Sequence, residues 1–156
     1  MKKYILPLSA SDRLPLTCSR TGTCCHGKAV WINPWELARL ANAKGVSPRE
    51  FRDSFCEFGG IRLHFNGPKG WKELSACSQY VEDFGCSVHE GRPLACRLYP
   101  LGRQKKSDTV QYIHEGKEFP CLEGCPEVVE LPSMSVSDYI TDQNAGVCET
   151  AQDAYL

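Results

Sequence analysis

Cysteine content is the feature of this sequence that most restricts its fold. Ten of the 156 residues are cysteine, and eight of the ten fall into three groups along the chain. The first group lies in CSRTGTCCHG (residues 18–27), the second between residues 77 and 96, and the third in FPCLEGCP (residues 119–126). Thiols grouped in this way form disulfide bridges, bind metal or take part in catalysis. The rest of the sequence indicates which of these alternatives applies.

The N-terminus argues against disulfides. Its apolar run extends only from Tyr4 to Leu8 and contains Pro7, so it is too short for the hydrophobic region of a secretory signal. No later segment is long and apolar enough to span a bilayer. We therefore expect a soluble, cytoplasmic protein, and the reducing cytosol favours metal binding or thiol chemistry over bridges. A secreted domain held by disulfides would need an export route that the sequence does not show.

The charge balance gives no sign of a polyanionic partner. Lys and Arg total 18 against 19 Asp and Glu, which leaves a net charge of −1. The only basic run, GRQKK at residues 102–106, is too short to form a phosphate-binding surface. We expect neither nucleic acid nor a membrane as partner, and a protein partner stays open.

Two helices are predicted from their capping residues. In NPWELARLANAKG (residues 33–45), Asn33 can cap, Pro34 suits the first helical position, Glu36 completes a capping box and Gly45 can end the helix. The segment SPREFRDSFCEF (residues 47–58) has the same capping pattern, with Ser47 as the cap, Pro48 at the first helical position and Glu50 to complete the capping box. We expect a short apolar face on the first helix, formed by Leu37, Leu40, Ala41 and Lys44, and a contact between Phe51 and Phe55 on the second.

Alternation of apolar and polar residues predicts short strands further along the chain. Ile61, Leu63 and Phe65 alternate with polar residues, and NGPKG (residues 66–70) can turn the chain back as a hairpin. TVQYIHEG (residues 109–116) alternates again. A short helix is expected to start at Pro93, and the segment from Ser135 onward predicts a terminal helix interrupted near Gly146, with inward-facing residues Val136, Tyr139, Ile140, Val147 and Ala151. The fold class expected is α+β: a single compact domain of short helices and a small antiparallel sheet around a cysteine-ligated metal site.

The spacing of the cysteines indicates a thiolate metal site. Sulfur ligands brought together from distant segments suit tetrahedral zinc or an iron–sulfur cluster. Neither a ferredoxin spacing nor a zinc-finger C-x2-C pair is present. The spacing therefore predicts the ligand chemistry and does not name the metal.

The sequence resembles the YkgJ-type cysteine-cluster family, which is described as a zinc- or iron-chelating domain. The resemblance rests on GTCC (residues 22–25) combined with GCSVHEGRPLACRLYP (residues 85–100), and it covers about residues 16–130, with 135–155 as a C-terminal helical extension of the single domain 1–156. Many members carry C-x2-C-G-x-C-C, whereas here five residues separate Cys18 from Cys24-Cys25. The resemblance implies that the metal ligands come from Cys18, Cys24, Cys25, Cys77, Cys86 and Cys96, with Cys121 and Cys125 as a trailing pair.

The number of sites stays open at this point. Eight thiols can fill two four-ligand sites, or one site with spare structural thiols. We favour at least one site that includes Cys18, Cys25, Cys86 and Cys96, with Cys24 serving a second site or packing inward.

The remaining cysteines, histidines and arginines have simpler interpretations. Cys56 and Cys148 are interpreted as buried small hydrophobes, and Cys121 with Cys125 as ligands or as a redox pair. His26 and His89 can bind metal or a thiolate, but a surface or supporting role is favoured for each, and His64 and His114 receive no role. Arg92 and Arg97 either offset thiolate charge or form salt bridges with Glu82, Asp83 or Glu90.

Three functions remain compatible with the sequence. The first is a metal-binding protein with a Cys-thiolate site that holds an iron–sulfur cluster or zinc; iron–sulfur is slightly favoured because thiols are many and histidines few. The second is a cluster-dependent modification enzyme or maturation factor, because flagellin lysine methylase carries a similar cysteine cluster. The third is a thiol redox protein that uses Cys24-Cys25 or Cys121/Cys125.

Overall fold

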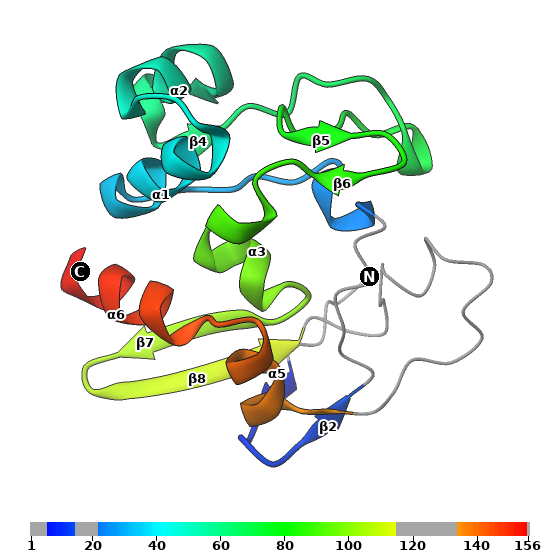
Figure 1. Cartoon of the computed structure of the whole chain (residues 1–156). Coiled ribbons are helices and arrows are strands. Elements are labelled where there is room, and N and C mark those ends of the chain that lie inside the picture. Colours follow the sequence, from blue (N-terminus) through cyan, green and yellow to red (C-terminus); the bar gives the residue numbers. More distant parts are fainter. Residues whose placement is uncertain (1–5, 15–21, 115–133, 156) are drawn as a thin grey trace.

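The computed structural model of the chain describes residues 6–14, 22–114 and 134–155, and it has the expected α+β fold (Figure 1). The helices are α1 (Pro34–Lys44), α2 (Pro48–Phe55), α3 (Leu94–Leu98), α5 (Val136–Asp142) and α6 (Gly146–Tyr155). Short 3-10 turns lie at η1 (Thr23–Cys25), η2 (Phe58–Gly60), η3 (Trp71–Glu73) and η4 (His89–Gly91). None of the helices in these ranges combines the length and apolarity needed to cross a membrane.

The strands are short and pair antiparallel. The longest sheet has the order β1-β8-β7, formed by Leu6–Leu8, Thr109–His114 and Gly102–Lys106. Three two-stranded pairs accompany it: β2 (Arg13–Leu14) with β9 (Met134–Ser135), β3 (Cys56–Glu57) with β4 (Arg62–Leu63), and β5 (Tyr80–Val81) with β6 (Gly85–Cys86). The strand predicted at residues 109–116 is confirmed as β8.

Both predicted N-terminal helices begin at their predicted capping residues, and α1 also ends at its predicted glycine. At α1, Asn33 accepts a hydrogen bond from the Glu36 amide, and Glu36 Oε1 accepts one from the Asn33 amide at 3.0 Å. Gly45 ends the helix in the left-handed conformation at φ 77°. At α2, Ser47 Oγ accepts from the Glu50 amide at 3.1 Å, and the Phe51 and Phe55 rings pack with their centroids 5.2 Å apart.

The hairpin predicted at residues 61–71 is wrong, because its first strand pairs with a different segment of the chain. Arg62–Leu63 pairs with Cys56–Glu57, which precedes it. The reason is the tight turn between them, in which Phe58, Gly59 and Gly60 all have positive φ and glycine adopts that conformation at little cost. The NGPKG segment does turn the chain back, but only one isolated bridge, between Lys69 and Ser75, follows from it.

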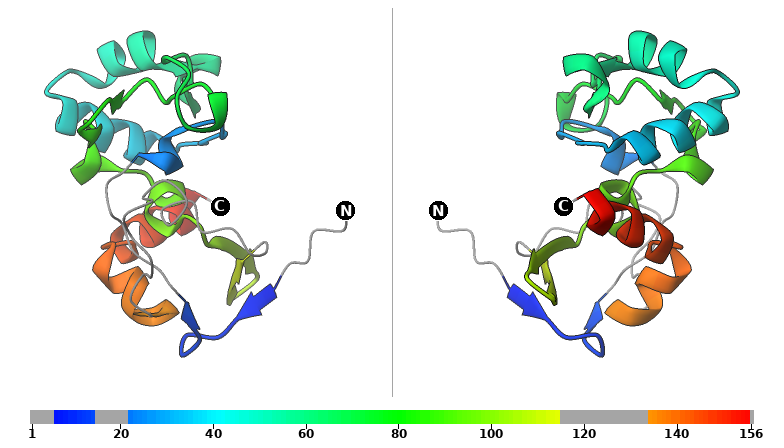
Figure 2. Two further views of the ribbon diagram at one scale, coloured as in Figure 1. Left: turned by 90° about the vertical axis from the view of Figure 1, so that its right-hand side faces the viewer. Right: turned by 90° about the vertical axis from the view of Figure 1, so that its left-hand side faces the viewer.

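Two hydrophobic clusters form the core, and the helices and strands around them lie one set above the other in Figures 1 and 2. The first lies between α3, the β7–β8 sheet and the two C-terminal helices, and its buried residues are Leu94, Leu98, Leu101, Val136, Tyr139, Ala145 and Cys148. The second lies between α1, α2 and the β3–β4 pair, and its buried residues are Val30, Ile32, Leu40, Ala41, Phe51, Leu63, Cys77 and Val88. Helix α3 contributes to both, because Leu94 and Leu98 enter the first cluster while Cys96 packs against the second.

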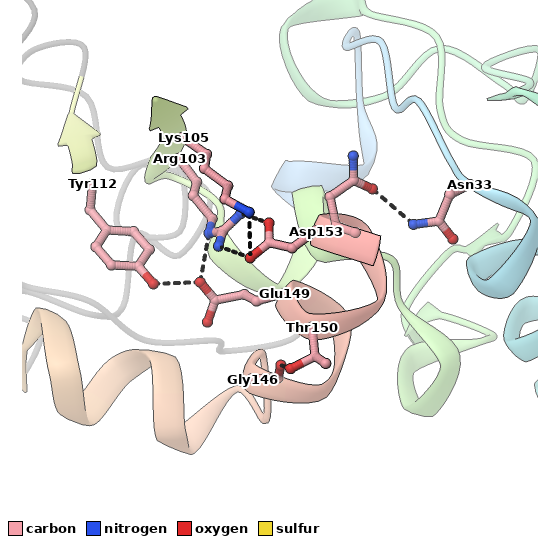
Figure 3. A network of polar contacts seen from close by, with 9 residues as sticks. Asn33, Arg103, Lys105, Tyr112, Gly146, Glu149, Thr150 and Asp153 are labelled. Atoms are coloured by element: carbon pink, nitrogen blue, oxygen red, sulfur yellow. Dashed lines mark hydrogen bonds and ion pairs between the residues drawn. The ribbon is translucent and has the colours of Figure 1, made fainter. Parts of the chain in front are cut away.

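The C-terminal segment is interrupted as predicted. Ser135 caps α5, the chain leaves the helix at Gln143–Ala145, and α6 starts at Gly146. Val147, predicted to face inward, is 48% exposed, and Cys148 takes the buried place. The break shifts the helical phase, which a continuous 3.6-residue period cannot anticipate. Arg103 of β7 holds α6 through ion pairs with Glu149 and Asp153 (Figure 3).

Candidate metal centre

Five thiols from separate segments of the chain line one pocket. Cys24 and Cys25 come from η1, Cys77 from the segment before β5, Cys86 from β6 and Cys96 from α3. The segments are joined through the backbone, since the Cys77 amide donates to the Cys25 carbonyl at 2.6 Å, and the residue after Cys25, His26, forms an antiparallel bridge with the residue before Cys77, Ala76. Lys28, His89 and Arg92 also line the pocket.

The GTCC motif folds into the turn that presents the adjacent cysteines. Gly22 has φ 80°, and a Cβ atom there would lie 2.2 Å from the Tyr80 ring. Only glycine therefore permits both the backbone conformation and this close approach. The 3-10 turn that follows places Cys24 and Cys25 at the same pocket, although the divergence of successive side chains favoured separate sites for them.

The opposite wall is fixed by contacts between α3 and α1. The Leu94 amide at the start of α3 donates to Glu36 Oε2 at 2.6 Å. Gly91 packs so closely on α1 that an added Cβ would lie 2.7 Å from the Arg39 carbonyl oxygen. These contacts position Cys96, two residues after Leu94, against the pocket.

The thiols interact with one another. The Cys25 thiol hydrogen-bonds with Cys24 and with Cys86, and these bonds lower the pKa of Cys24 and of Cys86 while they raise the pKa of Cys25. The cations Lys28 and Arg92 lower the pKa of Cys24 further. Burial raises the pKa of Cys77 to about 12 and also raises the pKa of Cys96. The pocket therefore favours thiolate at Cys24 and Cys86 and neutral thiol at the other positions.

Lys28 brings a buried positive charge to the pocket. Burial lowers the pKa of a lysine, but the neighbouring Cys96, Cys24, Tyr99 and Cys25 raise the pKa of Lys28 above its ordinary value. Its Nζ lies 4.1 Å from the centre of the Tyr99 ring. No pattern in the sequence predicts that Lys28 enters the pocket or that Glu36 accepts a second hydrogen bond from the Leu94 amide.

The predicted ligands separate into two sets. Cys24, Cys25, Cys77, Cys86 and Cys96 are brought together, whereas Cys18, Cys121 and Cys125 lie outside the described residues. Within residues 6–14, 22–114 and 134–155, no three His, Cys, Asp or Glu side chains have the arrangement of a ligand set around an ion. The pocket thus gathers five thiols at one cavity, among which Cys25 hydrogen-bonds with Cys24 and Cys86.

Of the other two described cysteines, Cys148 is buried as predicted, whereas Cys56 is only half-buried. Cys56, whose pKa burial raises to about 11, packs against the second core cluster and does not line the pocket. Cys148 is 1% exposed in the first cluster. Both act as small apolar residues.

The histidines and arginines need some correction. His26 is neither exposed nor part of the pocket lining: it is buried, and its Nδ1 lies 2.8 Å from the Gly22 carbonyl oxygen. His89 lines the pocket. Arg97 does not line it, because its guanidinium donates to the backbone carbonyls of Arg92, Gln143 and Glu90. These carbonyls belong to the segment before α3 and to the residue after α5, so Arg97 supports the fold. Of the two arginines, only Arg92 lines the pocket.

The cavity is small. Its volume is about 40 Å³, enough for an ion or a few water molecules, whereas pockets for organic ligands commonly measure about 300–1,000 Å³. The donor set is soft, since its polar groups are mainly sulfur, which favours zinc or iron over magnesium or calcium. The residues present therefore fit a thiolate-bound metal better than an organic substrate.

Comparison with known proteins agrees with this chemistry. A family model described as "CxxCxxCC: Putative zinc- or iron-chelating domain" matches residues 17–116, which is more than half of the 156 residues. The chain belongs to this family. The CxxCxxCC match confirms the resemblance found in the sequence and supports a metal-chelating role. It includes all five pocket cysteines and Cys18, whereas Cys121 and Cys125 lie beyond it. No significant match was found among curated proteins or solved structures.

Proposed function

We propose that the protein binds zinc or iron, the latter as an ion or as an iron–sulfur cluster, through the thiolates of this pocket. The observation that carries the proposal is the meeting of Cys24, Cys25, Cys77, Cys86 and Cys96 from four segments of the chain at one small cavity. A single buried cysteine commonly acts as a small apolar residue, whereas five thiols that line one cavity form a set of soft metal ligands.

Cys86 and Cys96 are proposed as ligands from the central motif, with Cys24 or Cys25 from the first. Cys18 is proposed as a further ligand because of its place in the family motif. Cys121 and Cys125 are proposed as ligands because of the resemblance to the family. Bound metal would hold these thiols as thiolates and act as a structural centre, a Lewis acid or an electron carrier. Because Cys25 hydrogen-bonds with Cys24 and Cys86, we expect these three thiols to turn toward the ion when it binds.

We also propose that the C-terminal helices and the metal site belong to one domain over residues 1–156. Arg92, at the pocket, donates to Gln143 Oε1 at 3.0 Å, and Arg97 beside it donates to the Gln143 carbonyl at 2.9 Å. We therefore propose that the helical extension at residues 135–155 supports the metal site rather than folding separately.

The test is metal analysis of protein purified anaerobically, with zinc, iron and acid-labile sulfide measured per chain. Iron with sulfide would identify a cluster, and stoichiometric zinc would identify a mononuclear site. Cys86→Ser and Cys96→Ser are expected to lose most of the bound metal, because each removes a proposed ligand. Cys56→Ala, which changes a half-buried thiol outside the pocket, is the matched control and is expected to keep it. Full metal content in both serine variants would contradict the ligand assignment, and metal-free wild-type protein would leave thiol redox chemistry as the better account.

A further inference from the structure

The ammonium of Lys28 is buried in an unusual way. Lysine normally keeps its charged end in water and lays its carbon chain on apolar surface. Here the residue as a whole is half-buried, while its Nζ atom is buried and has no hydrogen-bond acceptor among the described residues. The charged end thus points inward.

An ammonium in this position is costly to the metal-free protein. It loses hydration, and none of its three donors is satisfied by the described part of the chain. The contact with the Tyr99 ring, at 4.1 Å, offsets only part of this cost. A group kept at such a cost needs a negative partner.

The pocket supplies that partner when its thiols are ionised. Lys28 lines the same cavity as the five cysteines, so thiolates formed there provide the negative charge near its ammonium. A divalent ion bound by four thiolates still carries excess negative charge. That negative charge is stabilised by cationic side chains that donate hydrogen bonds to the thiolate sulfurs.

We propose that Lys28 is the counter-charge of the metal site and donates hydrogen bonds to the thiolates that hold the metal. The proposal rests on the proposed metal-binding function. Arg92 is already engaged with the His89 carbonyl and with Gln143 Oε1, which fixes its guanidinium at the edge of the pocket. Lys28 is therefore a positioning residue that acts on the ligands and does not touch the metal.

The test compares Lys28→Met with wild-type protein by chelator competition for Zn2+ under reducing conditions. Methionine keeps the length of the side chain and removes its charge, so affinity for Zn2+ is expected to fall about 10- to 100-fold, as for other residues that support metal ligands. Lys28→Arg keeps the charge and is expected to restore most of the affinity. The metal-free Lys28→Met protein should be as stable as the metal-free wild type or more so, because it no longer buries an unsatisfied charge.

Lys44→Met is the matched control. Lys44 also stands over an aromatic ring, with Nζ 5.2 Å from the Phe55 centroid, and is half-buried, but it does not line the pocket. Its substitution should leave Zn2+ affinity unchanged. Wild-type affinity in Lys28→Met, or an equal loss in Lys44→Met, would overturn the proposal while leaving the metal site in place. A Lys28→Met protein that is less stable without metal and unaltered in affinity would overturn the proposal in favour of a purely structural role. Wild-type protein that binds neither Zn2+ nor iron would overturn both proposals.

Discussion

At the scale of single residues, Glu36 joins two helices that begin far apart in the chain. One carboxylate oxygen accepts from the Asn33 amide, which starts α1, and the other accepts from the Leu94 amide, which starts α3. The side chain is 3% exposed. Because Leu94 is followed by Cys96, the carboxylate also fixes one wall of the thiol pocket.

Glu36→Gln is expected to lower the free energy of unfolding by about 1–3 kcal/mol. The amide keeps one acceptor but turns an NH2 group toward the second backbone N–H, so one buried donor loses its partner. Chemical denaturation measures the effect. Glu50→Gln, at the equivalent exposed position of α2, is the control and should change stability by less than about 0.5 kcal/mol. Equal stability of Glu36→Gln and wild type would contradict the role given to the second oxygen.

Half of this arrangement can be predicted from the sequence. The spacing of Asn33 and Glu36 predicts the capping box because both contacts lie within one turn. The contact with Leu94 joins residues 58 positions apart, and nothing in local spacing encodes it. Lys28 is similar: it stands three residues after Cys25, and only the tertiary structure shows that its ammonium enters the pocket.

At the scale of elements, a polar network joins β7 and β8 to α6. Arg103 pairs with Glu149 at 2.8 Å and with Asp153 at 2.8 Å, and the Tyr112 hydroxyl donates to Glu149 (Figure 3). Burial first, and then the bond to Glu149, raise the pKa of Tyr112 to about 12. The network therefore ties the last helix to the sheet through a tyrosine that resists ionisation.

The pH dependence follows from the sign of that shift. The folded pKa of Tyr112 lies above the ordinary value of about 10, so its contribution to stability is fully present below about pH 10 and is lost as pH rises toward about 12. Alkaline titration of tyrosinate absorbance should show a late transition that Tyr112→Phe removes. Tyr155→Phe, which changes an exposed tyrosine at the end of α6, should retain it. A late transition that persists in Tyr112→Phe would contradict the assignment.

The elements themselves differ in how far sequence predicts them. Helices α1 and α2 follow from caps and spacing because their signals are local. The pairing of β3 with β4 was missed because strands of two residues carry too little alternation to identify their partner. At the C-terminus, Ser135 predicts the start of α5, but the break before Gly146 resets the phase and buries Cys148 in place of Val147.

At the scale of the whole molecule, the thiols belong to one of the two core clusters. Cys77 is a buried member of the second cluster, and Cys25, Cys86 and Cys96 pack against it. The first cluster contains no pocket cysteine, and its β7–β8 sheet and C-terminal helices are held by apolar contacts and the Arg103 network. The grouping of cysteines in the sequence predicts that they meet, whereas the division of the core between two clusters depends on long-range packing that no local pattern carries.

This division predicts that metal removal loosens the two clusters unequally. The proposed ligand bonds would link η1, β6 and α3 across the second cluster. A chelator should therefore increase amide hydrogen exchange in α1, β3, β4 and β6 more than in β7, β8, α5 and α6. At free metal about 100-fold above its dissociation constant, bound metal stabilises the native state by about 2.7 kcal/mol, which sets the largest expected loss of protection.

Hydrogen exchange with mass spectrometry can compare the two regions in one sample. Cys86→Ser, which lacks a proposed ligand, is the control: its second cluster should exchange fast with or without metal, and its first cluster should match the wild type. An equal loss of protection in both clusters would mean that the chain unfolds as one cooperative unit, and the metal would then stabilise the whole molecule rather than the half that contains its ligands. A chelator that leaves exchange unchanged throughout would contradict any coupling between the thiol pocket and the fold.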